Sequence, residues 1–271
     1  MDAITIRRAE TPADYKACQE AQRLAWGIVE DGYVVPVATM VGAQLHGGLV
    51  LGAFLADGRA LAMNFAFLGR LEGRLCLYSQ LLGVVPGHQD LGLGGRMKQA
   101  QRAFAKADGL DWVVWAFDPL QAGNARFNLD KIGARGVRYV EDMYGPRTDA
   151  LNAGTPTDRL IVEWPTSGDP PEPVPFEEAW SYPRLIEIGP DGPMVTIPKA
   201  DRLALEVPAD NKALRDQDAD LALRWRLAVR GAFQGAFQQG HRAIGFARGE
   251  VDGARRCVYI LARGRAVSNV D

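Results

Sequence analysis

The stretch Val84-Val85-Pro86-Gly87-His88-Gln89-Asp90-Leu91-Gly92-Leu93-Gly94-Gly95-Arg96-Met97-Lys98 decides the fold of this chain. An apolar run ends at Pro86, a glycine-rich turn follows, and apolar residues then recur at helical spacing. Such a turn leaves the first N–H groups of the helix without partners, beside the positive end of the helix dipole. Glycines also let the backbone approach an anion closely. The stretch therefore predicts a strand, a phosphate-binding turn and a helix.

Several kinds of phosphate-binding turn share this layout. A Walker loop ends in Gly-Lys-Ser/Thr, whereas this chain continues from its last glycine with Arg96. A dinucleotide-binding turn needs a third glycine, and Met97 stands at that position. Residues 89–94 fit a third kind, Gln/Arg-x-x-Gly-x-Gly/Ala. A glycine-rich turn that holds no ligand is the alternative.

The predicted elements around the turn follow a recognisable order. A strand is expected over 75–85, a helix with Met97, Ala100, Phe104 and Ala107 on its apolar face, a strand over 112–117, a short helix over 124–132 and a strand over 137–140. With the phrase Trp115-x-x-Asp118-Pro119-Leu120-x-x-x-Asn124-Ala125-x-Phe127-Asn128, residues 1–165 resemble the GNAT superfamily of N-acetyltransferases. Most of the chain resembles a long-chain branch of predicted acyltransferases in that superfamily.

The resemblance implies an α/β (α+β) fold, the GNAT fold, with a central mixed, mostly antiparallel sheet flanked by helices and a C-terminal α/β extension. Residues 1–165 are expected to form the acyl-CoA-binding and catalytic domain. Residues 166–200 are expected to be an extended linker, because 165–200 hold nine of the 16 prolines. Residues 201–271, with a long helix over 219–239, are expected to serve packing or dimerisation, as a degenerate half of the same fold.

The resemblance also implies the ligand: acetyl-CoA or another acyl-CoA, with succinyl-CoA as an alternative donor, and no metal. The strand would pair with the pantetheine arm, the turn would hold the pyrophosphate, and the short helix would contact the pantetheine. The expected cofactor-binding residues are Leu82, Gly83, Val84, Val85, Gln89, Asp90, Leu91, Gly92, Leu93, Gly94, Gly95, Asn124 and Phe127. Asn124 could also cap its helix. Arg96 and Lys98 are expected either at the adenosine phosphates or as exposed helix cations.

Acyl transfer needs a neutral amine, a stabilised oxyanion and a proton for the leaving thiolate. In many of these transferases a tyrosine donates this proton, and its position is Leu129 here. Because leucine cannot donate a proton, Tyr139, Tyr144 or a water is expected to replace it. The expected catalytic residues are Asn128, Tyr139, Tyr144 and Asp118. Local hydrogen bonding is the alternative for Asn128, and turn formation is the alternative for Asp118.

The sequence indicates fewer residues that would bind the acceptor amine. His46 lies in the segment 27–48, and Arg159 would bind an acceptor carboxylate or pair internally with Asp158. The expected reaction is direct attack on the thioester by a small-molecule amine, such as an amino acid, in a ternary complex. A succinyl donor would need a cation such as Arg126, Arg138 or Arg159. The alternatives are an idle acyl-CoA-binding or regulatory module, motivated by Leu129, and a dimerisation scaffold that binds no CoA.

Composition agrees with a globular enzyme. The chain has 271 residues, 47% hydrophobic and 24% charged, with a net charge of −2. It has no basic cluster, so nucleic acid is not an expected partner. Its three cysteines lie far apart and suggest neither a disulfide framework nor a metal site. No signal peptide or membrane-spanning run is seen, and a cytoplasmic homodimer is expected.

Overall fold

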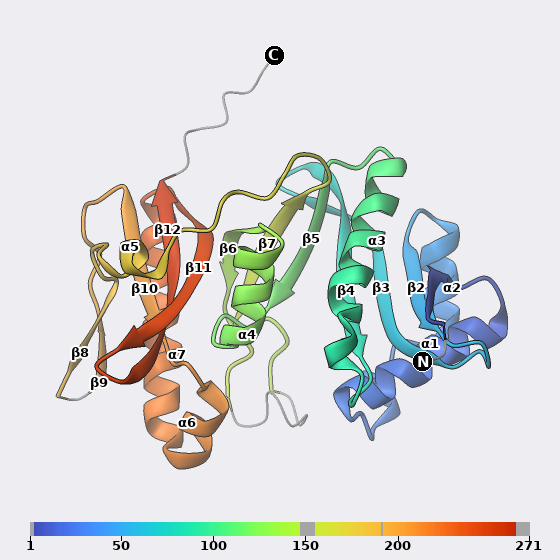
Figure 1. The fold of residues 1–271 in the computed structure, drawn as a ribbon, viewed down its shortest axis with the longest axis horizontal. Coiled ribbons are helices and arrows are strands. Elements are labelled where there is room, and N and C mark those ends of the chain that lie inside the picture. The colour runs from blue at the N-terminus through green and yellow to red at the C-terminus, as the bar shows by residue number, and fades with distance from the viewer. Residues whose placement is uncertain (1–2, 147–154, 191, 264–271) are drawn as a thin grey trace. The chain divides into compact units, whose positions relative to one another are not determined.

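The computed structural model describes residues 3–146, 155–190 and 192–263. It has two compact units: unit 1 comprises Met1–Trp115 and Pro165–Gly168, and unit 2 comprises Ala116–Trp164 and Asp169–Asp271. Each unit combines strands with helices (Figure 1). Among the described residues β4 and β5 pair in parallel, and antiparallel pairing joins β1–β2, β2–β3, β3–β4, β6–β7, β6–β11, β11–β12, β10–β12 and β8–β9. The predicted α/β (α+β) class, a mixed and mostly antiparallel sheet flanked by helices, is therefore confirmed.

The sheet of unit 1 follows the strand order β1-β2-β3-β4-β5. Its strands are β1 (Thr5–Arg8), β2 (Leu49–Phe54), β3 (Ala60–Leu71), β4 (Arg74–Val84) and β5 (Trp112–Phe117), the last of which runs on into unit 2. Its helical segments are α1 (Pro12–Trp26), η1 (Asp31–Tyr33), α2 (Val37–Leu45), η2 (Gln89–Leu91) and α3 (Leu93–Ala107). The dipeptide Asp57-Gly58, which is typical of hairpin turns, lies between β2 and β3, with Gly58 at φ +87°.

Helices cover both faces of this sheet. Neighbouring residues of a strand point to opposite faces. In β3, Phe65 belongs to the core cluster that includes Tyr15 of α1 and Met40 of α2. Its neighbour Asn64 accepts a hydrogen bond from Gln101 of α3 at 2.9 Å. Helix α3 therefore lies on the face opposite α1 and α2.

Local sequence explains the start of α1. Thr11 accepts a hydrogen bond from the Asp14 N–H at 3.2 Å, and Asp14 accepts one from the Thr11 N–H at 3.1 Å. This reciprocal capping box is accompanied by Pro12 at the first turn, and threonine followed by proline is typical of a helix start. Arg7 of β1 also donates to Asp14, at 2.8 Å, so the cap ties the helix to the sheet edge.

The sheet of unit 2 follows the order β7-β6-β11-β12-β10. Its strands are β6 (Arg135–Val140), β7 (Arg159–Pro165), β10 (Arg202–Val207), β11 (His241–Val251) and β12 (Ala254–Arg263). A separate hairpin pairs β8 (Ile186–Gly189) with β9 (Gly192–Val195). The helical segments are α4 (Ala122–Ala125), the π-helical turn η3 (Arg126–Lys131), α5 (Phe176–Trp180), α6 (Asn211–Gln217) and α7 (Ala219–Gln238).

Helix α7, the long helix expected from the sequence, packs on this sheet through aromatic rings. Phe233 is fully buried, and its ring lies 5.1 Å from Tyr259 of β12 and 5.5 Å from Tyr139 of β6, measured between centroids. Asp218 caps the helix by accepting a hydrogen bond from the Leu221 N–H at 2.8 Å. The C-terminal residues are thus part of the core of unit 2.

The expected domain boundaries at residues 165 and 200 do not coincide with the two compact units. Strand β6 pairs with β11 at Gly136 and Ala243, so the C-terminal strands continue the sheet of β6 and β7. A side chain at position 136 would meet the Ala243 Cβ at 2.9 Å, so glycine permits this close approach. The segment 166–200 is not uniformly extended, because it forms α5 and the β8–β9 hairpin.

Among the described residues, no single helix is long and apolar enough to cross a membrane. One bent pair, Pro12–Trp26 with Asp31–Leu45, passes by length and composition, with a bend of 106°. Both segments supply side chains to the core cluster of unit 1, Tyr15 and Met40 among them.

Candidate functional site

The turn between β4 and α3 has the geometry that its sequence predicts. Gly92 adopts φ +65°, in the left-handed region, and immediately precedes the first residue of α3. The first bond within the helix runs from the Arg96 N–H to the Gly92 carbonyl at 3.1 Å. The N–H groups of Leu93, Gly94 and Gly95 precede it and belong to the first turn, whose N–H groups have no partner within the helix. They point outward at the positive end of the helix dipole.

The space in front of this turn is open. A Cβ placed at Gly92, Gly94 or Gly95 would meet no heavy atom within 4 Å. Gln89 closes the turn from the other side, since its Oε1 accepts a hydrogen bond from the Gly87 N–H at 3.0 Å. The structure therefore brings together one group of the expected cofactor residues, namely Gln89, Asp90, Leu91, Gly92, Leu93, Gly94 and Gly95.

Strand β4 leads into the turn and parts from β5 before reaching it. The parallel pairing covers Leu77 with Val113 and Tyr78 with Val114, while β4 continues to Val84. On the side of β3 the register shifts between the Phe65–Leu81 and Ala66–Ser79 pairs. Gln80 is thus an extra residue, a β-bulge that bends the strand just beyond its last pair with β5.

Of the expected pantetheine-pairing residues, Leu82, Gly83 and Val84 lie at the end of β4, and Val85 follows directly after it. Leu82, Gly83 and Val84 pair with β3, and the Val85 N–H donates to the Leu61 carbonyl at 2.9 Å. Gly83 also has a packing role, because a Cβ there would meet the Trp26 ring at 2.4 Å. Their other backbone edge faces away from β3, toward the side on which β5 departs.

A buried polar cluster lies on the α3 side of the same strands. Lys98 is 4% exposed, and its Nζ donates to Ser79 Oγ at 3.3 Å and to Gln101 Oε1 at 3.2 Å. Asn64 Nδ2 donates to Ser79 Oγ at 3.2 Å and to the Leu81 carbonyl at 2.7 Å. Burial lowers the pKa of Lys98 to about 7.

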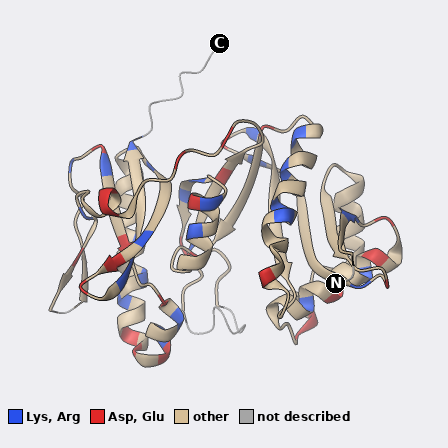
Figure 2. Ribbon diagram, in the orientation of Figure 1, with Lys and Arg blue, Asp and Glu red and all other residues tan. Residues whose placement is uncertain are grey.

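The position of Lys98 differs from both sequence expectations, a ligand of adenosine phosphates or an exposed cation. The predicted apolar face of the helix is rotated: the buried residues of α3 are Leu93, Met97, Lys98, Gln101 and Ala105. Polar side chains occupy this face because they satisfy one another there. The signal was present in the spacing, since Lys98 and Gln101 lie three residues apart and share a helix face with Ala105. Figure 2 shows the basic positions along α3, which has no acidic residue.

In unit 2, Asp118 is held by α7. Arg226 donates to both carboxylate oxygens, at 2.6 and 2.9 Å, and the Leu120 N–H donates to Oδ1 at 2.9 Å. Arg226 is 3% exposed. The carboxylate is therefore paired and also closes the turn after β5, as the alternative from turn chemistry predicted. A general-base role for Asp118 stays a prediction.

A second arginine of α7 holds Asp158. Arg230 donates to both carboxylate oxygens at 2.9 and 2.8 Å, and Tyr139 Oη donates to Oδ2 at 2.7 Å. Burial opposes ionisation of Asp158, but the hydrogen bonds from Arg230, the Asp142 N–H and Tyr139 outweigh it and lower its pKa. Burial and the Asp158 charge raise the pKa of Tyr139. Sequence reasoning missed both α7 arginines; their spacing of four residues on a largely buried helix face was the available signal.

The short helix expected over 124–132 is α4 followed by the π-helical turn η3. Asn124 is exposed and lies inside α4, whose N-cap is Gln121, so its alternative role as the cap is wrong. In η3, Asn128 and Leu129 are buried and Phe127 is half-buried. π-Helical turns are frequent at functional sites. Roles for Asn124, Phe127 and Asn128 stay predictions.

The expected acceptor-binding residues, Arg159 and His46, belong to different units, and the expected catalytic residue Tyr144 belongs to unit 2. In unit 2, Arg159 is 9% exposed, donates to the Asp158 carbonyl at 2.8 Å and lies over the Tyr144 ring at 5.2 Å. Asp158 pairs with Arg230, so the predicted internal ion pair of Asp158 with Arg159 is not formed through its carboxylate. In unit 1, His46 is exposed and ends α2. Within the described ranges, no group of three or more His, Cys, Asp and Glu side chains could hold a metal ion.

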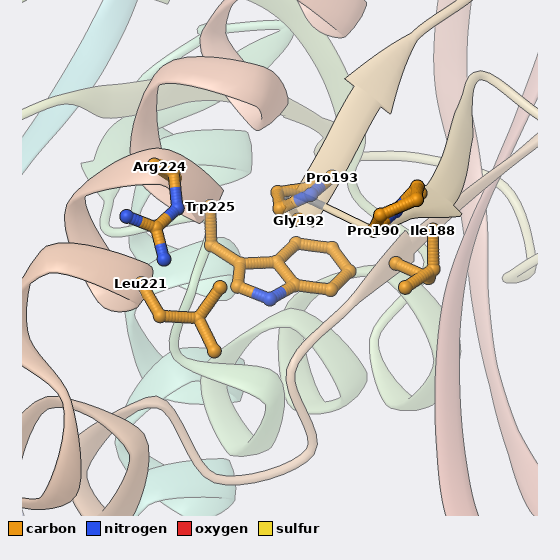
Figure 3. Close-up of a pocket in the computed structure, with 8 residues that line it drawn as sticks. Ile188, Pro190, Gly192, Pro193, Leu221, Arg224 and Trp225 are labelled. Carbon is orange, nitrogen blue, oxygen red and sulfur yellow. The ribbon is translucent and has the colours of Figure 1, made fainter.

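The described residues also line two pockets. A cavity of about 610 Å³ in unit 2 lies between the β8–β9 hairpin and α7, where Figure 3 shows the Trp225 indole between helix and hairpin residues. Its lining is apolar apart from Arg224 and Trp225, so it offers no nucleophile or acid. A cavity of about 620 Å³ in unit 1 lies beside the glycine turn and is lined in part by His88, Leu91 and Arg96.

Comparison with known proteins gives a likeness in fold. No protein-family model matches the chain, and no curated protein matches it in sequence. Among solved structures, a candidate acetyltransferase of Salmonella typhimurium with its cofactor acetyl-CoA is 21% identical, with a TM-score of 0.48 over 61% of this chain and 95% of that one. The ribosomal-protein-S18-alanine N-acetyltransferase of Escherichia coli is 19% identical, with a TM-score of 0.47 over 61% and 96%. A GNAT-family acetyltransferase of Staphylococcus aureus is 12% identical, with a TM-score of 0.44 over 61% and 100%.

The three solved structures are acetyltransferases, the class of enzyme that the sequence resembles, and each is matched over 61% of this chain. Identities and scores of this size establish neither a substrate nor a site residue. The chemistry has to be argued from the residues themselves.

Proposed function

We propose that this chain is an acyl-CoA-dependent N-acyltransferase that acylates the amine of a small molecule. The observation that carries the proposal is the direct continuity of β4, the glycine turn and α3. A phosphate binds at such a helix start. An extended arm attached to that phosphate can then pair with the backbone of the preceding strand, as peptides do at a sheet edge. Acyl-CoA combines a pyrophosphate with an amide-containing arm, so it suits this arrangement.

The residues of unit 1 fit the two parts of the ligand. The N–H groups of Leu93, Gly94 and Gly95 would hold the pyrophosphate, with no side chain in the way. The backbone of Leu82 to Val85 would pair with the pantetheine arm. Arg96 lines the adjoining cavity and is suited to the adenosine phosphates. When bound, acyl-CoA supplies an acyl group activated as a thioester.

The acceptor is proposed to be an amine that attacks the thioester directly, with an amino acid as the first class to test. Acetyl and succinyl are the two donors proposed. Of the cations suggested for a succinyl tail, Arg126 pairs with Asp130 at 3.4 Å, and Arg138 is exposed. Arg159 and His46 remain the proposed acceptor contacts. A homodimer and a cytoplasmic location stay predictions.

An idle acyl-CoA-binding or regulatory module is the second candidate. Three observations favour it: Leu129 has no proton to donate, the Tyr139 hydroxyl already donates its hydrogen bond to Asp158, and Asp118 is paired with Arg226. Such a module would bind CoA tightly and turn over no amine.

Thermal unfolding with CoA, acetyl-CoA, succinyl-CoA and NAD tests the proposal. A ligand at about 100 times its dissociation constant adds about 2.7 kcal/mol to the free energy of unfolding. We expect stabilisation by the CoA species and none by NAD. Absence of any shift with the CoA species would overturn the proposal. Shifts without turnover of any amine would favour the idle module.

A further inference from the structure

Lys98 lies at the point where β4 and β5 part. The last paired residues are Tyr78 of β4 and Val114 of β5. The next residue of each strand contacts the Lys98 ammonium group: Ser79 Oγ lies 3.3 Å from Nζ, and the centroid of the Trp115 ring lies 3.6 Å from it. The side chain therefore spans the apex of the opening between the strands, next to the bulge at Gln80.

The positive charge at this apex has no counter-charge. The groups that face Nζ are Ser79 from β4, Gln101 from α3 and the Trp115 ring from β5, and none of them titrates near neutral pH. Across the described part of the chain, no carboxylate lies within ion-pair distance of Lys98. The next basic residue of the same helix, Arg102, turns away and donates to the Pro165 and Gly168 carbonyls.

A purely structural role does not account for this charge. Burial of an ammonium group without a carboxylate opposes folding, and an apolar side chain of similar length would avoid that penalty. Ser79 Oγ and Gln101 Oε1 nevertheless accept two of the three N–H bonds of Lys98, and the Trp115 ring lies beside the ammonium group, so its position is fixed while one N–H bond has no acceptor atom among the described residues. A buried, oriented and unpaired cation stabilises negative charge that develops beside it.

We propose that Lys98 is a catalytic residue, the acid that protonates the sulfur of CoA as it leaves. This inference rests on the proposed function, since the turn and the edge of β4 would bring the thioester to the apex. The acceptor nitrogen forms a bond to the thioester carbonyl carbon, and the carbon–sulfur bond breaks with its electron pair on sulfur. The sulfur takes a proton from Nζ, which becomes neutral. The nitrogen of the new amide loses a proton to solvent, and Lys98 then takes up a proton from solvent.

The acidity of Lys98 suits this step. Its pKa of about 7, lowered by burial, is below the value of about 8.5 for a free thiol. Proton transfer from ammonium to thiolate is then favourable, and an acid whose pKa lies near the working pH is the most effective. Lys98 would thereby supply the proton that Leu129 cannot.

A titration tests the contact without relying on turnover. In protein carrying ¹³C-labelled lysine, the Cε signal that is missing from Lys98→Met reports the protonation of Lys98. We expect its midpoint with bound CoA to differ by about one pH unit from that with bound desulfo-CoA, which lacks the sulfur, because only a sulfur in contact with Nζ would perturb the titration of Lys98. Equal midpoints with both ligands would overturn the inference, although binding of both would leave the proposed function standing.

Rates with acetyl-CoA and methoxyamine, a small nucleophile that is neutral from about pH 6 upward, give the second readout. Wild-type kcat/KM is expected to fall as pH rises through about 7. Lys98→Met should lower it about 100-fold at pH near 6 and remove this fall, and Lys98→Arg should also remove the fall because arginine stays charged. Lys106→Met, an exposed lysine of the same helix, should match wild type.

The outcomes separate the two proposals. If no CoA species stabilises the protein, the proposed function fails and this inference fails with it. If CoA binds but no thiol is released with any nucleophile, the idle module replaces the transferase and this inference fails with it. If Lys98→Met is slow while keeping the wild-type pH profile, the inference alone is overturned. A sulfur-dependent midpoint together with loss of the alkaline fall supports it.

Discussion

Arg226 of α7 donates to both carboxylate oxygens of Asp118, at 2.6 and 2.9 Å, across 108 positions of sequence. Both partners are largely withdrawn from solvent, with side-chain exposures of 4% and 12%. Because Asp118 also accepts the Leu120 N–H, this pair connects the C-terminal helix to the turn that starts α4. The Arg226–Asp118 pair is therefore expected to stabilise the conformation of unit 2 around η3.

Removal of one partner of this pair should be strongly destabilising. Arg226→Ala leaves Asp118 charged and unpaired, which is expected to lower the free energy of unfolding by about 3–5 kcal/mol. Arg224→Ala, an exposed arginine two residues away, should change it by less than about 0.5 kcal/mol. Urea denaturation of both variants measures the difference. Equal effects would contradict the assignment of the pair as a buried one.

The contribution of Lys98 to the free energy of unfolding should increase with pH between about pH 7 and pH 10. Its pKa is about 7 when folded and about 10.4 when unfolded, so between these values the unfolded chain binds a proton that the folded chain does not. Raising the pH from 7 to 10 should therefore stabilise wild type relative to Lys98→Met by about 1.4 kcal/mol per pH unit. Parallel denaturation series across this range check the slope. A difference that stays constant with pH would show that Lys98 titrates normally.

Asp158 should govern part of the acid sensitivity. Its folded pKa lies below the unfolded value of about 3.9, so its contribution is present above that pH and is lost as pH falls through the folded pKa. Asp158→Asn should be less stable than wild type at neutral pH and should lose less stability on acidification. Asp216→Asn, which removes an exposed partner of Lys212, should follow wild type. Circular dichroism during acid titration distinguishes the three proteins.

A side chain added to the glycine turn should leave folding intact but prevent the binding of CoA. Gly94→Val meets no atom within 4 Å, so the variant should fold with near-wild-type stability. The added side chain would stand where phosphate oxygens bind, and the stabilisation of about 2.7 kcal/mol by saturating CoA should disappear. Gly32→Val has equally open surroundings in η1 and should keep that stabilisation. Loss of CoA stabilisation in both variants, or in neither, would argue against the turn as the binding site.

Local features of the fold were predictable from sequence, and long-range ones were not. The cap at Thr11, the hairpin at Gly58 and the turn at Gly92 each depend on a few neighbouring residues of types that are typical of these structures, and the turn appears as expected. The burial of Lys98 depends on which face α3 turns to the sheet, and tertiary packing decides that. The helical spacing of apolar residues alone predicted a face with Ala100 and Phe104, whereas the buried face carries Lys98 and Gln101.

The candidate site shows the same division. The open turn at Gly94 and Gly95 follows from local backbone chemistry. The pairing of Asp118 and Asp158 with two arginines of α7 requires contacts across 108 and 72 positions, which no local pattern encodes. The proline content of 166–200 indicated an absence of regular structure, but the hairpin of β8 and β9 forms there, because hydrogen bonding across a two-stranded pair needs few residues.

The two arginines of α7 have a practical consequence for anyone who shortens the gene. A clone that stops at residue 200 would keep the glycine turn and every residue expected to act on the acyl group. It would also delete Arg226 and Arg230, and with them the partners of two carboxylates, one of which, Asp158, has no exposed surface. The smallest stable product is therefore expected to include α7 and the strands that follow it, and expression trials should be designed around that length.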